Sequence, residues 1–288
     1  MKKVTILGMG RWASCIAYLL NYKKLKVTMW QRQESEECPL FKTHTNQYLT
    51  LPKSVVFTHD LSSAINSADV VIISILSQNL QNLMDNLKTV KGYQNKYYCI
   101  AMKGIEASTG RRLSEILRDA GIPRGNIAVW AGPGHVQSLA NGGTANMMIS
   151  AYNDKLAKSL AETFSSNKVH LSTSSDIVGT ELGAAAKNVF GIAAGIMQGC
   201  EQYKHCIGGL IVASVKEMAE FIDALGGKRE SARGLALLGD YQATMFDDSS
   251  KNLTYGKSII KYNPIDKDTL SSILQLKVRK ELKLVMQF

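Results

Sequence analysis

The sequence predicts an α/β fold in which a Rossmann-type, doubly wound sheet is followed by an all-helical C-terminal domain. A β-rich run, a glycine-rich turn and a helical stretch come first along the chain. Strand-like apolar runs then alternate with helical segments, which is typical of parallel sheets. After Ser175 the strand-like runs end. We therefore expect a dinucleotide-binding domain over residues 1–175 and a helical substrate-binding and catalytic domain over residues 176–288.

Length and composition are those of a globular protein with room for two domains. The chain has 288 residues, of which 45% are hydrophobic and 20% are charged. Its longest uncharged apolar run, residues 70–76, is far too short to cross a bilayer, and the apolar run before Gly8 is too short for a signal peptide. We therefore expect a cytoplasmic protein without membrane insertion.

Cysteine usage and net charge narrow the class of ligand. The five cysteines are scattered, with neither a C-x-x-C pair nor zinc spacing, so we expect reduced thiols and no metal site. The net charge of +10 fits either a basic surface or an anionic partner. Because no basic patch is interleaved with aromatic residues, phosphorylated small molecules are favoured over nucleic acid.

The N-terminal strand, turn and helix form a dinucleotide-binding motif. A strand over residues 3–7 leads into G-x-G-x-x-A, with Gly8, Gly10 and Ala13 at its fixed positions, and a helix follows to residue 20. Gly8 permits the tight turn, Gly10 lets the backbone approach a pyrophosphate, and Ala13 lets the helix pack closely on the strand. The pyrophosphate would then lie at the helix N-terminus.

The end of the second predicted strand, residues 26–30, indicates the cofactor. NAD-specific folds commonly place Asp or Glu here, to bind the ribose 2′-hydroxyl. This chain has Gln31-Arg32-Gln33 instead. An arginine suits a 2′-phosphate, so the sequence favours NADPH over NADH. The alternative is a solvent-exposed loop arginine with Glu34 nearby.

Further strands and helices alternate along the rest of the first domain. The turn Gly132-Pro133-Gly134 offers backbone N–H groups to an anion, and Lys103 follows a strand whose carboxyl end should face the ligand crevice. Residues 34–52 are expected to form a polar loop with short helical pieces. We expect strands over residues 69–76, 97–101, 127–130, 145–150 and 168–171, and helices over residues 77–87, 110–120 and 154–164.

An apolar helix around Lys187 is the most unusual segment of the second domain. Helical spacing places Gly183, Ala184, Gly191 and Ala194 on the same face as Lys187. This face has almost no side chains, so we expect a ligand to approach the ammonium there, and burial would lower the lysine pKa. The alternative is a core helix whose lysine reaches water and whose small residues serve tight packing. Further helices are expected over residues 209–225, 231–246 and 266–288.

Six motifs occur in one order along the chain. They are Gly8-x-Gly10-x-Trp12-Ala13, Met102-Lys103-Gly104-Ile105-Glu106, Gly132-Pro133, Gly179-x-Glu181-Leu182-Gly183-x-x-x-Lys187-Asn188, Gly239-Asp240-x-x-x-Thr244 and Ser250-Lys251-Asn252. Together they resemble the bacterial-type NAD(P)-dependent glycerol-3-phosphate dehydrogenase family, from Met1 to about Gly256. The resemblance implies reversible reduction of dihydroxyacetone phosphate to sn-glycerol 3-phosphate for glycerophospholipid synthesis, with NADP or NAD as cofactor. A homodimer is compatible with it.

The resemblance also implies roles for individual residues. Lys187 is the catalytic acid and base, and Lys103 joins it at the catalytic site. Two lysines at one site would lower each other's pKa. The implied substrate-binding residues are Lys103, Gly132, Gly134, Asn188, Asp240, Thr244, Ser250, Lys251 and Asn252. The implied cofactor-binding residues are Gly8, Gly10, Arg11, Trp12, Ala13, Arg32, Lys103, Val136 and Lys251.

Departures from the family pattern leave two alternatives open. Gly134 stands where the family usually has Ser or Thr, and Ser138 where it has Glu. Lys251 replaces an arginine that would bind phosphate through two N–H groups. A Val-Glu-Gly segment is not recognisable, and the chain is shorter than the family at its C-terminus. The alternatives are a dehydrogenase for another small phosphorylated keto compound or hydroxy acid, and a cofactor-binding protein without turnover.

Overall fold

A computed structural model describes residues 1–32, 39–200, 206–247 and 250–262 of the chain. Eight strands form one sheet in the order β3-β2-β1-β4-β5-β6-β7-β8. β7 runs antiparallel to β6, and all other neighbouring strands are parallel. The strands are β1 (Lys3–Leu7), β2 (Lys26–Trp30), β3 (Val56–Thr58), β4 (Val70–Ile73), β5 (Tyr97–Ile100), β6 (Ile127–Ala131), β7 (Ala145–Ala151) and β8 (Val169–Ser174). The order of β1 to β6 confirms the doubly wound sheet.

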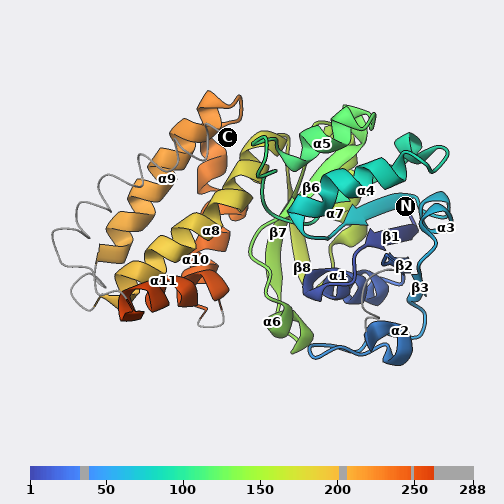
Figure 1. The fold of residues 1–288 in the computed structure, drawn as a ribbon, viewed down its shortest axis with the longest axis horizontal. Coiled ribbons are helices and arrows are strands. Elements are labelled where there is room, and N and C mark those ends of the chain that lie inside the picture. The colour runs from blue at the N-terminus through green and yellow to red at the C-terminus, as the bar shows by residue number, and fades with distance from the viewer. Residues whose placement is uncertain (33–38, 201–205, 248–249, 263–288) are drawn as a thin grey trace.

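Helices cover both faces of this sheet (Figure 1). Buried side chains of α1, α6 and α7 join one apolar core, whereas those of α3, α4 and α5 join a second core on the other face. These helices are α1 (Arg11–Tyr22), α3 (Leu61–Asn66), α4 (Leu80–Leu87), α5 (Leu113–Asp119), α6 (Val136–Ala140) and α7 (Asp154–Phe164). The short helix α2 (Pro39–Thr43) lies in the segment predicted to be a loop with helical pieces.

The strand predictions differ from the structure at two places. The strand expected over residues 69–76 ends at Ile73, and the chain bends at Ile75, after the N–H of Ser74 has donated to the carbonyl oxygen of Leu7 at 2.9 Å. The edge strand β3 was not predicted, since it has three residues and none of them is buried. A strand this short and exposed carries too little alternation of apolar and polar residues to be recognised.

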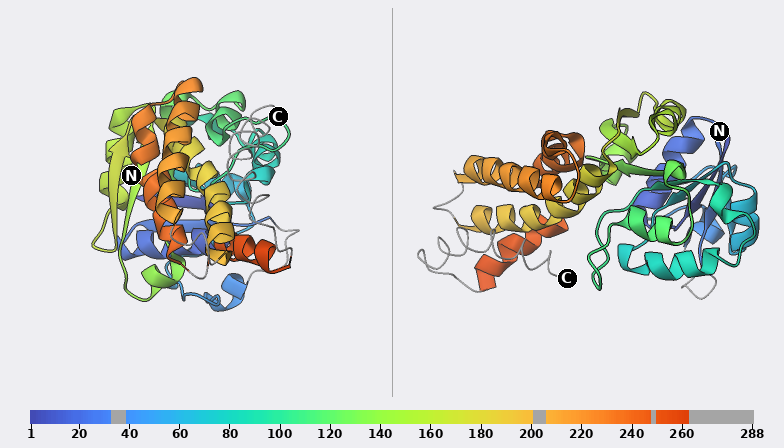
Figure 2. Two further views of the ribbon diagram at one scale, coloured as in Figure 1. Left: turned by 90° about the vertical axis from the view of Figure 1, so that its left-hand side faces the viewer. Right: turned by 90° about the horizontal axis from the view of Figure 1, so that it is seen from above.

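The C-terminal part is an extended group of helices beside the sheet. α8 (Ile177–Gly199) leads away from the sheet, with α9 (Ile207–Ala224) and α11 (Lys251–Tyr262) on either side of it (Figures 1 and 2). The chain changes from strand to helix between Ser174 and Ile177. This change lies at the predicted domain division, but one apolar core continues from the sheet into the helices. The division itself therefore stays a prediction.

The helix predicted over residues 231–246 is wrong as a continuous element. The segment forms a 3₁₀ turn η5 (Arg229–Arg233), a π turn η6 (Leu235–Gly239) and the short helix α10 (Asp240–Met245). Gly234 adopts an extended conformation between the first two, with ψ of −178°, and so ends the hydrogen-bond ladder there. α11 was not predicted, and the expected helix over residues 266–288 lies outside the described residues.

A buried polar network anchors the start of α8 to the start of α5. The carboxylate of Glu181 accepts hydrogen bonds from the backbone N–H of Ser114 at 2.8 Å and from Arg112 at 3.0 Å. Burial raises the pKa of Glu181, and its bonds to Ser114 and Arg112 act in the opposite direction. Because Glu181 lies two turns before Lys187, this network also fixes where Lys187 stands relative to the sheet.

Candidate functional site

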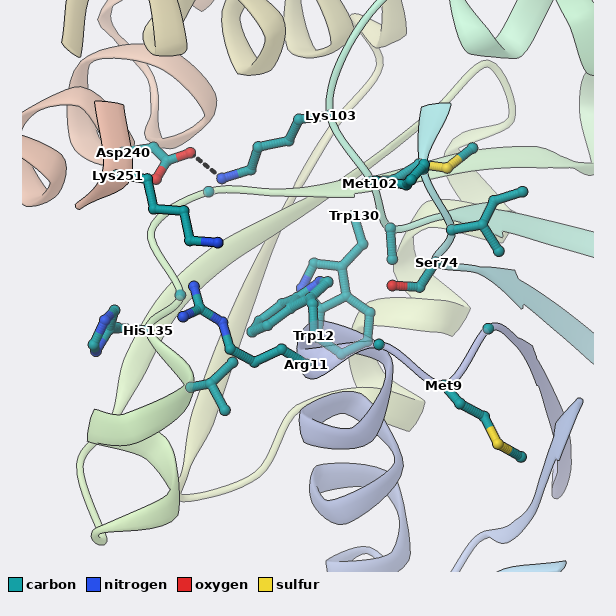
Figure 3. Close-up of a pocket in the computed structure, with 18 of the residues that line it drawn as sticks. Met9, Arg11, Trp12, Ser74, Met102, Lys103, Trp130, His135, Asp240 and Lys251 are labelled. Atoms are coloured by element: carbon teal, nitrogen blue, oxygen red, sulfur yellow. Dashed lines mark hydrogen bonds and ion pairs between the residues drawn. The ribbon is translucent and has the colours of Figure 1, made fainter. Parts of the chain in front are cut away.

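A large cavity lies between the carboxyl ends of the strands and the helical part of the chain. Its volume is about 1070 Å³, large enough for a dinucleotide and a small substrate together. Among the predicted site residues, Ala13 and Asn188 are the two that do not line it. Those that do are Gly8, Gly10, Arg11, Trp12, Arg32, Lys103, Gly132, Gly134, Val136, Lys187, Asp240, Thr244, Ser250, Lys251 and Asn252. Figure 3 shows several of them around the cavity.

The glycine turn after β1 fits a dinucleotide. Gly8 has a φ of +123°, and a Cβ atom there would lie 2.2 Å from the carbonyl oxygen of Ser74, so the turn needs glycine. A Cβ on Gly10 would meet nothing within 4 Å. Gly10 is the N-cap of α1 and has no side chain that could accept a hydrogen bond. The first N–H groups of the helix are therefore not capped by a side chain. The open space before these N–H groups suits a pyrophosphate.

Ala13 has a packing role in this motif. Its side chain is fully buried in the core between α1 and the sheet, and it does not line the cavity. This burial confirms the close packing of helix on strand that the sequence predicted for this position.

The side chain of Trp12 explains one departure from the family pattern. Its ring makes an edge contact with Trp130, with 6.5 Å between the ring centroids. A Cβ atom on Gly134 would lie 2.7 Å from the Trp12 ring and 3.1 Å from the sulfur of Met147. Trp12 therefore occupies the space that a serine or threonine side chain at position 134 would need.

The turn after β6 brings backbone to the cavity wall. Gly132 has a φ of +122°, and a Cβ atom there would lie 3.0 Å from the Cα atom of Met147. Val136 begins α6 directly after this turn, and its side chain is buried. The turn thus brings glycine backbone, without a side chain at position 132 or 134, to the cavity wall.

Arg32 lies just beyond the end of β2, where the sequence placed it. Its side chain is exposed, and the residue lines the cavity. The neighbouring positions Gln33 and Glu34 lie outside the described residues. The role of Arg32 in reading the cofactor stays a prediction.

Two lysines meet on one carboxylate at the centre of the cavity. Lys103, which follows β5, donates a hydrogen bond to Asp240, the first residue of α10 (Figure 3). The Nζ atom of Lys187 lies 3.4 Å from the other carboxylate oxygen of Asp240. It also donates to the hydroxyl of Thr244 at 3.0 Å. The Asp240 side chain is only 6% exposed, so this charge is held in a largely dry place.

The environment of Lys187 lowers its pKa. Burial is the main cause, because the side chain is 13% exposed and a charged ammonium loses hydration there. The positive charge of Lys103 acts in the same direction, while the carboxylates of Asp240 and Asp247 raise the pKa. The predicted lowering is therefore confirmed for Lys187.

Most small residues of α8 pack against other elements, whereas Lys187 itself lines the cavity, where a ligand can approach its ammonium. A Cβ atom on Gly183 would lie 3.0 Å from Leu237, and one on Gly191 would lie 3.2 Å from Thr244. A Cβ atom on Gly195 would lie 2.2 Å from the carbonyl oxygen of Leu253 in α11. The small face is thus covered by η6, α10 and α11, as the packing alternative proposed. Ala184 and Ala194 are buried as well.

Asn188 and the residues that start α11 form a second polar group. Asn188 lies outside the cavity lining and accepts a hydrogen bond from the side chain of Asn252 at 2.9 Å. Lys251 is exposed and is the first residue of α11, so it does not lie in a loop. Ser250, Lys251 and Asn252 all line the cavity. Asn188 therefore contacts a residue of the cavity wall without lining the cavity itself.

The loop that carries Lys103 is held by residues to which the sequence gave no role. The side chain of Gln78 donates to the carbonyl oxygen of Ile105 at 2.8 Å and accepts from the N–H of Ala107 at 2.9 Å. Glu106 and Arg111 form an ion pair at 2.8 Å within the same loop. Glu106 belongs to a recognised motif, but nothing in the sequence pointed to Arg111 as its partner.

His135 and Asp247 are two further cavity residues that sequence reasoning missed. Their side chains are in contact, with 3.0 Å between Nε2 of His135 and Oδ2 of Asp247. They are far apart in the chain, and no local pattern links them. Among the described residues there is no group of three or more His, Cys, Asp or Glu that could hold a metal ion. Within the same part of the chain, no helix is long and apolar enough to span a membrane.

Comparisons with known proteins agree with this site. The family profile described as the N-terminus of NAD-dependent glycerol-3-phosphate dehydrogenase matches residues 3–157, and the profile of its C-terminus matches residues 176–285. The similarity therefore extends beyond Gly256, where the motifs end. The glycerol-3-phosphate dehydrogenase (NAD(P)+) of Chlamydia pneumoniae is 32% identical to this chain, over 87% of this chain and 76% of the relative. That of Streptomyces griseus is also 32% identical, over 89% and 78%.

Solved structures show the same fold. The glycerol-3-phosphate dehydrogenase from Coxiella burnetii superposes with a TM-score of 0.83 at 23% identity, covering 99% of this chain and 89% of its own. The enzyme from Plasmodium falciparum gives a TM-score of 0.82 at 21% identity, covering 94% and 80%. The arrangement of sheet and helices described above is therefore the arrangement of these proteins.

Proposed function

The chain belongs to the NAD-dependent glycerol-3-phosphate dehydrogenase family, and from this premise we propose how its cavity performs the reaction. The protein is an oxidoreductase that reduces dihydroxyacetone phosphate to sn-glycerol 3-phosphate with NAD(P)H, reversibly, for glycerophospholipid synthesis. One observation carries the proposal for the site. Lys103 and Lys187 share the buried carboxylate of Asp240 inside a cavity that begins at a dinucleotide-binding turn.

The first domain holds the cofactor. The N–H groups after Gly10 bind the pyrophosphate. Ala13 lets α1 pack closely on the sheet, which places these N–H groups beside the pyrophosphate. Arg11, Trp12, Lys103, Val136 and Lys251 line the remaining space, with Arg32 placed for a ribose 2′-phosphate, which favours NADP over NAD. When bound, NAD(P)H supplies the hydride that reduces the carbonyl carbon of the substrate.

The opposite wall holds the phosphate of the substrate. Lys251 supplies a positive charge, and Ser250 and Asn252 supply polar groups beside it. The turn of Gly132 and Gly134 faces them with backbone N–H groups. Asn188 holds the side chain of Asn252 at 2.9 Å and so orients it. This arrangement binds a dianion between the two domains.

Lys187 moves the proton. As the carbonyl oxygen becomes an alkoxide, the Lys187 ammonium donates a proton to it and gives the hydroxyl group of glycerol 3-phosphate. A lowered pKa makes this ammonium a better acid. The ammonium of Lys103 adds positive charge where negative charge develops. Asp240 and Thr244 orient Lys187. In the reverse direction, neutral Lys187 accepts the proton.

A direct assay tests this function. Oxidation of NADPH, followed at 340 nm, should depend on added dihydroxyacetone phosphate. Other small phosphorylated keto compounds and hydroxy acids serve as competing substrates. If the protein binds NADPH, which its fluorescence reports, but turns over none of these compounds, it is a binding protein and the proposal is wrong.

We also propose that the protein works in the cytoplasm as a homodimer. The described cysteines Cys15, Cys99, Cys200 and Cys206 are free thiols, which suits a reducing compartment. Val189, Val212 and Tyr255 expose apolar surface on three helices, which a second copy could cover. Size-exclusion chromatography with light scattering measures the oligomeric state, and a monomer at assay concentration would contradict the dimer.

A further inference from the structure

A contact between His135 and Asp247 joins the sheet part of the chain to the helical part at the cavity. His135 follows the turn of Gly132 and Gly134 and precedes α6, whereas Asp247 lies just after α10. Their side chains are 37% and 31% exposed, and the Nε2 and Oδ2 atoms lie 3.0 Å apart. Both residues line the same cavity as Lys187 and Lys251. The contact therefore spans from the glycine-rich turn of the first domain to the helical part.

The backbone of Asp247 is hydrogen-bonded to α10 and to the residue that precedes α11. Its N–H donates to the carbonyl oxygen of Thr244 in α10 at 3.4 Å. Its carbonyl oxygen accepts from the N–H of Ser250 at 2.9 Å, directly before Lys251 begins α11. The backbone of Asp247 is thus hydrogen-bonded to the residue directly before Lys251.

The charge of Asp247 also reaches the catalytic group. Its carboxylate is one of the charges that raise the pKa of Lys187. A carboxylate this close to a phosphate-binding wall repels the substrate less when a hydrogen-bond donor is held beside it. His135 supplies a hydrogen-bond donor at that place, and Figure 3 shows it among the residues around the cavity.

We infer that His135 is a positioning residue, which acts through Asp247 to hold Lys251 and Asn252 against the turn of Gly132 and Gly134. The inference rests on the proposed function and deepens it, because it names what fixes the phosphate-binding wall relative to the first domain. The pair does not touch the reacting carbonyl. Its loss should therefore weaken binding of the phosphate substrate more than it slows the chemical step.

The experiment compares the variants His135→Ala, Asp247→Ala, the double variant and Asp247→Asn. Each alanine variant should raise KM for dihydroxyacetone phosphate about three- to tenfold, the range of a partly exposed polar contact to a carboxylate. The double variant should be no worse than the single ones, because both remove the same contact. Asp247→Asn keeps an oxygen acceptor for His135, so its KM for dihydroxyacetone phosphate should stay close to wild type. The KM for NADPH should change by less than about twofold in every variant, and so should kcat in His135→Ala, which keeps the carboxylate of Asp247.

An ion pair outside the cavity provides the control. Arg229 and Asp223 lie 2.8 Å apart, about half exposed, and neither lines the cavity. Asp223→Ala should leave both KM values unchanged. Unchanged KM for dihydroxyacetone phosphate in both alanine variants would overturn the inference. The inference would also be overturned if KM for dihydroxyacetone phosphate rose no more in these variants than in Asp223→Ala. A joint loss of kcat, NADPH binding and melting temperature would overturn it as well, because it would indicate general damage to the structure.

A binding measurement separates this inference from the proposed function. Trp12 and Trp130 line the cavity, so their fluorescence can report binding of glycerol 3-phosphate without turnover. The same variants should weaken this binding by the same factor. If the wild type neither binds glycerol 3-phosphate nor reduces dihydroxyacetone phosphate, the proposed function is wrong and the inference falls with it. If the wild type does both and the variants match it, only the inference is wrong.

Discussion

The ammonium of Lys187 lies 3.4 Å from a carboxylate oxygen of Asp240, although the two residues come from different helices. Asp240 also binds Lys103, so one buried negative charge stands between two positive ones. This arrangement lets both lysines face a carbonyl oxygen while a net positive charge remains for the developing alkoxide. It also ties the catalytic site to α10, which follows directly on η6.

Replacing Lys187 should abolish turnover without unfolding the protein. For Lys187→Ala we expect kcat to fall at least about a hundredfold, because the proton donor is lost from the transition state. NADPH fluorescence and circular dichroism should stay close to wild type. Lys216→Ala on α9, an exposed lysine outside the cavity, is the control. Residual activity within tenfold of wild type would remove Lys187 from the mechanism.

The lowered pKa of Lys187 should set opposite pH dependences for the two directions. Reduction needs the ammonium, so kcat should fall as pH rises through the lowered pKa, well before the usual lysine value of 10.5. Oxidation of glycerol 3-phosphate needs the neutral amine, so its kcat should rise through the same pKa. Rate profiles in both directions measure this. A shared midpoint at or above the usual lysine pKa would contradict the assignment.

Arg32 should make NADPH the better cofactor. We expect kcat/KM to be higher with NADPH than with NADH, because the guanidinium can bind the 2′-phosphate with charge-assisted hydrogen bonds. Arg32→Asp should narrow or reverse this ratio, with little change in KM for dihydroxyacetone phosphate. Equal kcat/KM values for the two cofactors in the wild type, or a preference for NADH, would show that Arg32 does not recognise the 2′-phosphate.

Lys251 should contribute strongly to binding of the substrate phosphate. Lys251→Ala should raise KM for dihydroxyacetone phosphate by roughly ten- to a hundredfold, which corresponds to about 1.4–3 kcal/mol for a charged contact. Lys251→Arg should be neutral or beneficial, since a guanidinium adds a paired N–H geometry to the same charge. Unchanged kinetics in Lys251→Ala, with no competition from inorganic phosphate, would favour a different substrate.

The close crossing of α8 and α11 should not tolerate a side chain. Gly195→Ala places a Cβ atom 2.2 Å from the carbonyl oxygen of Leu253, and we expect a loss of about 1–3 kcal/mol in the free energy of unfolding. Gly209 lies in α9, and a Cβ atom there meets nothing within 4 Å. Gly209→Ala should therefore stabilise by about 0.5–1 kcal/mol. Urea denaturation measures both, and equal effects would refute the packing argument.

Two differences between prediction and structure arise from tertiary packing, which the sequence pattern does not show. The continuous helix expected over residues 231–246 is broken because Gly234 takes an extended conformation that the rest of the fold imposes. The apolar pattern of that segment is periodic enough for a helix, and periodicity carries no information on such a break. Likewise, the small residues of α8 were visible in the sequence, but not which elements cover them.

The sequence by itself determined the elements whose cause is local. The first strand, the turn of Gly8 and Gly10 and the helix after them follow from backbone conformation and nearest neighbours, and so does the α8 helix around Lys187. The order of motifs determined the family. Only the tertiary structure decided that Asp240 joins Lys103 to Lys187, and that His135 meets Asp247. These contacts depend on how helices pack on the sheet, because packing brings together residues that no spacing along the chain relates.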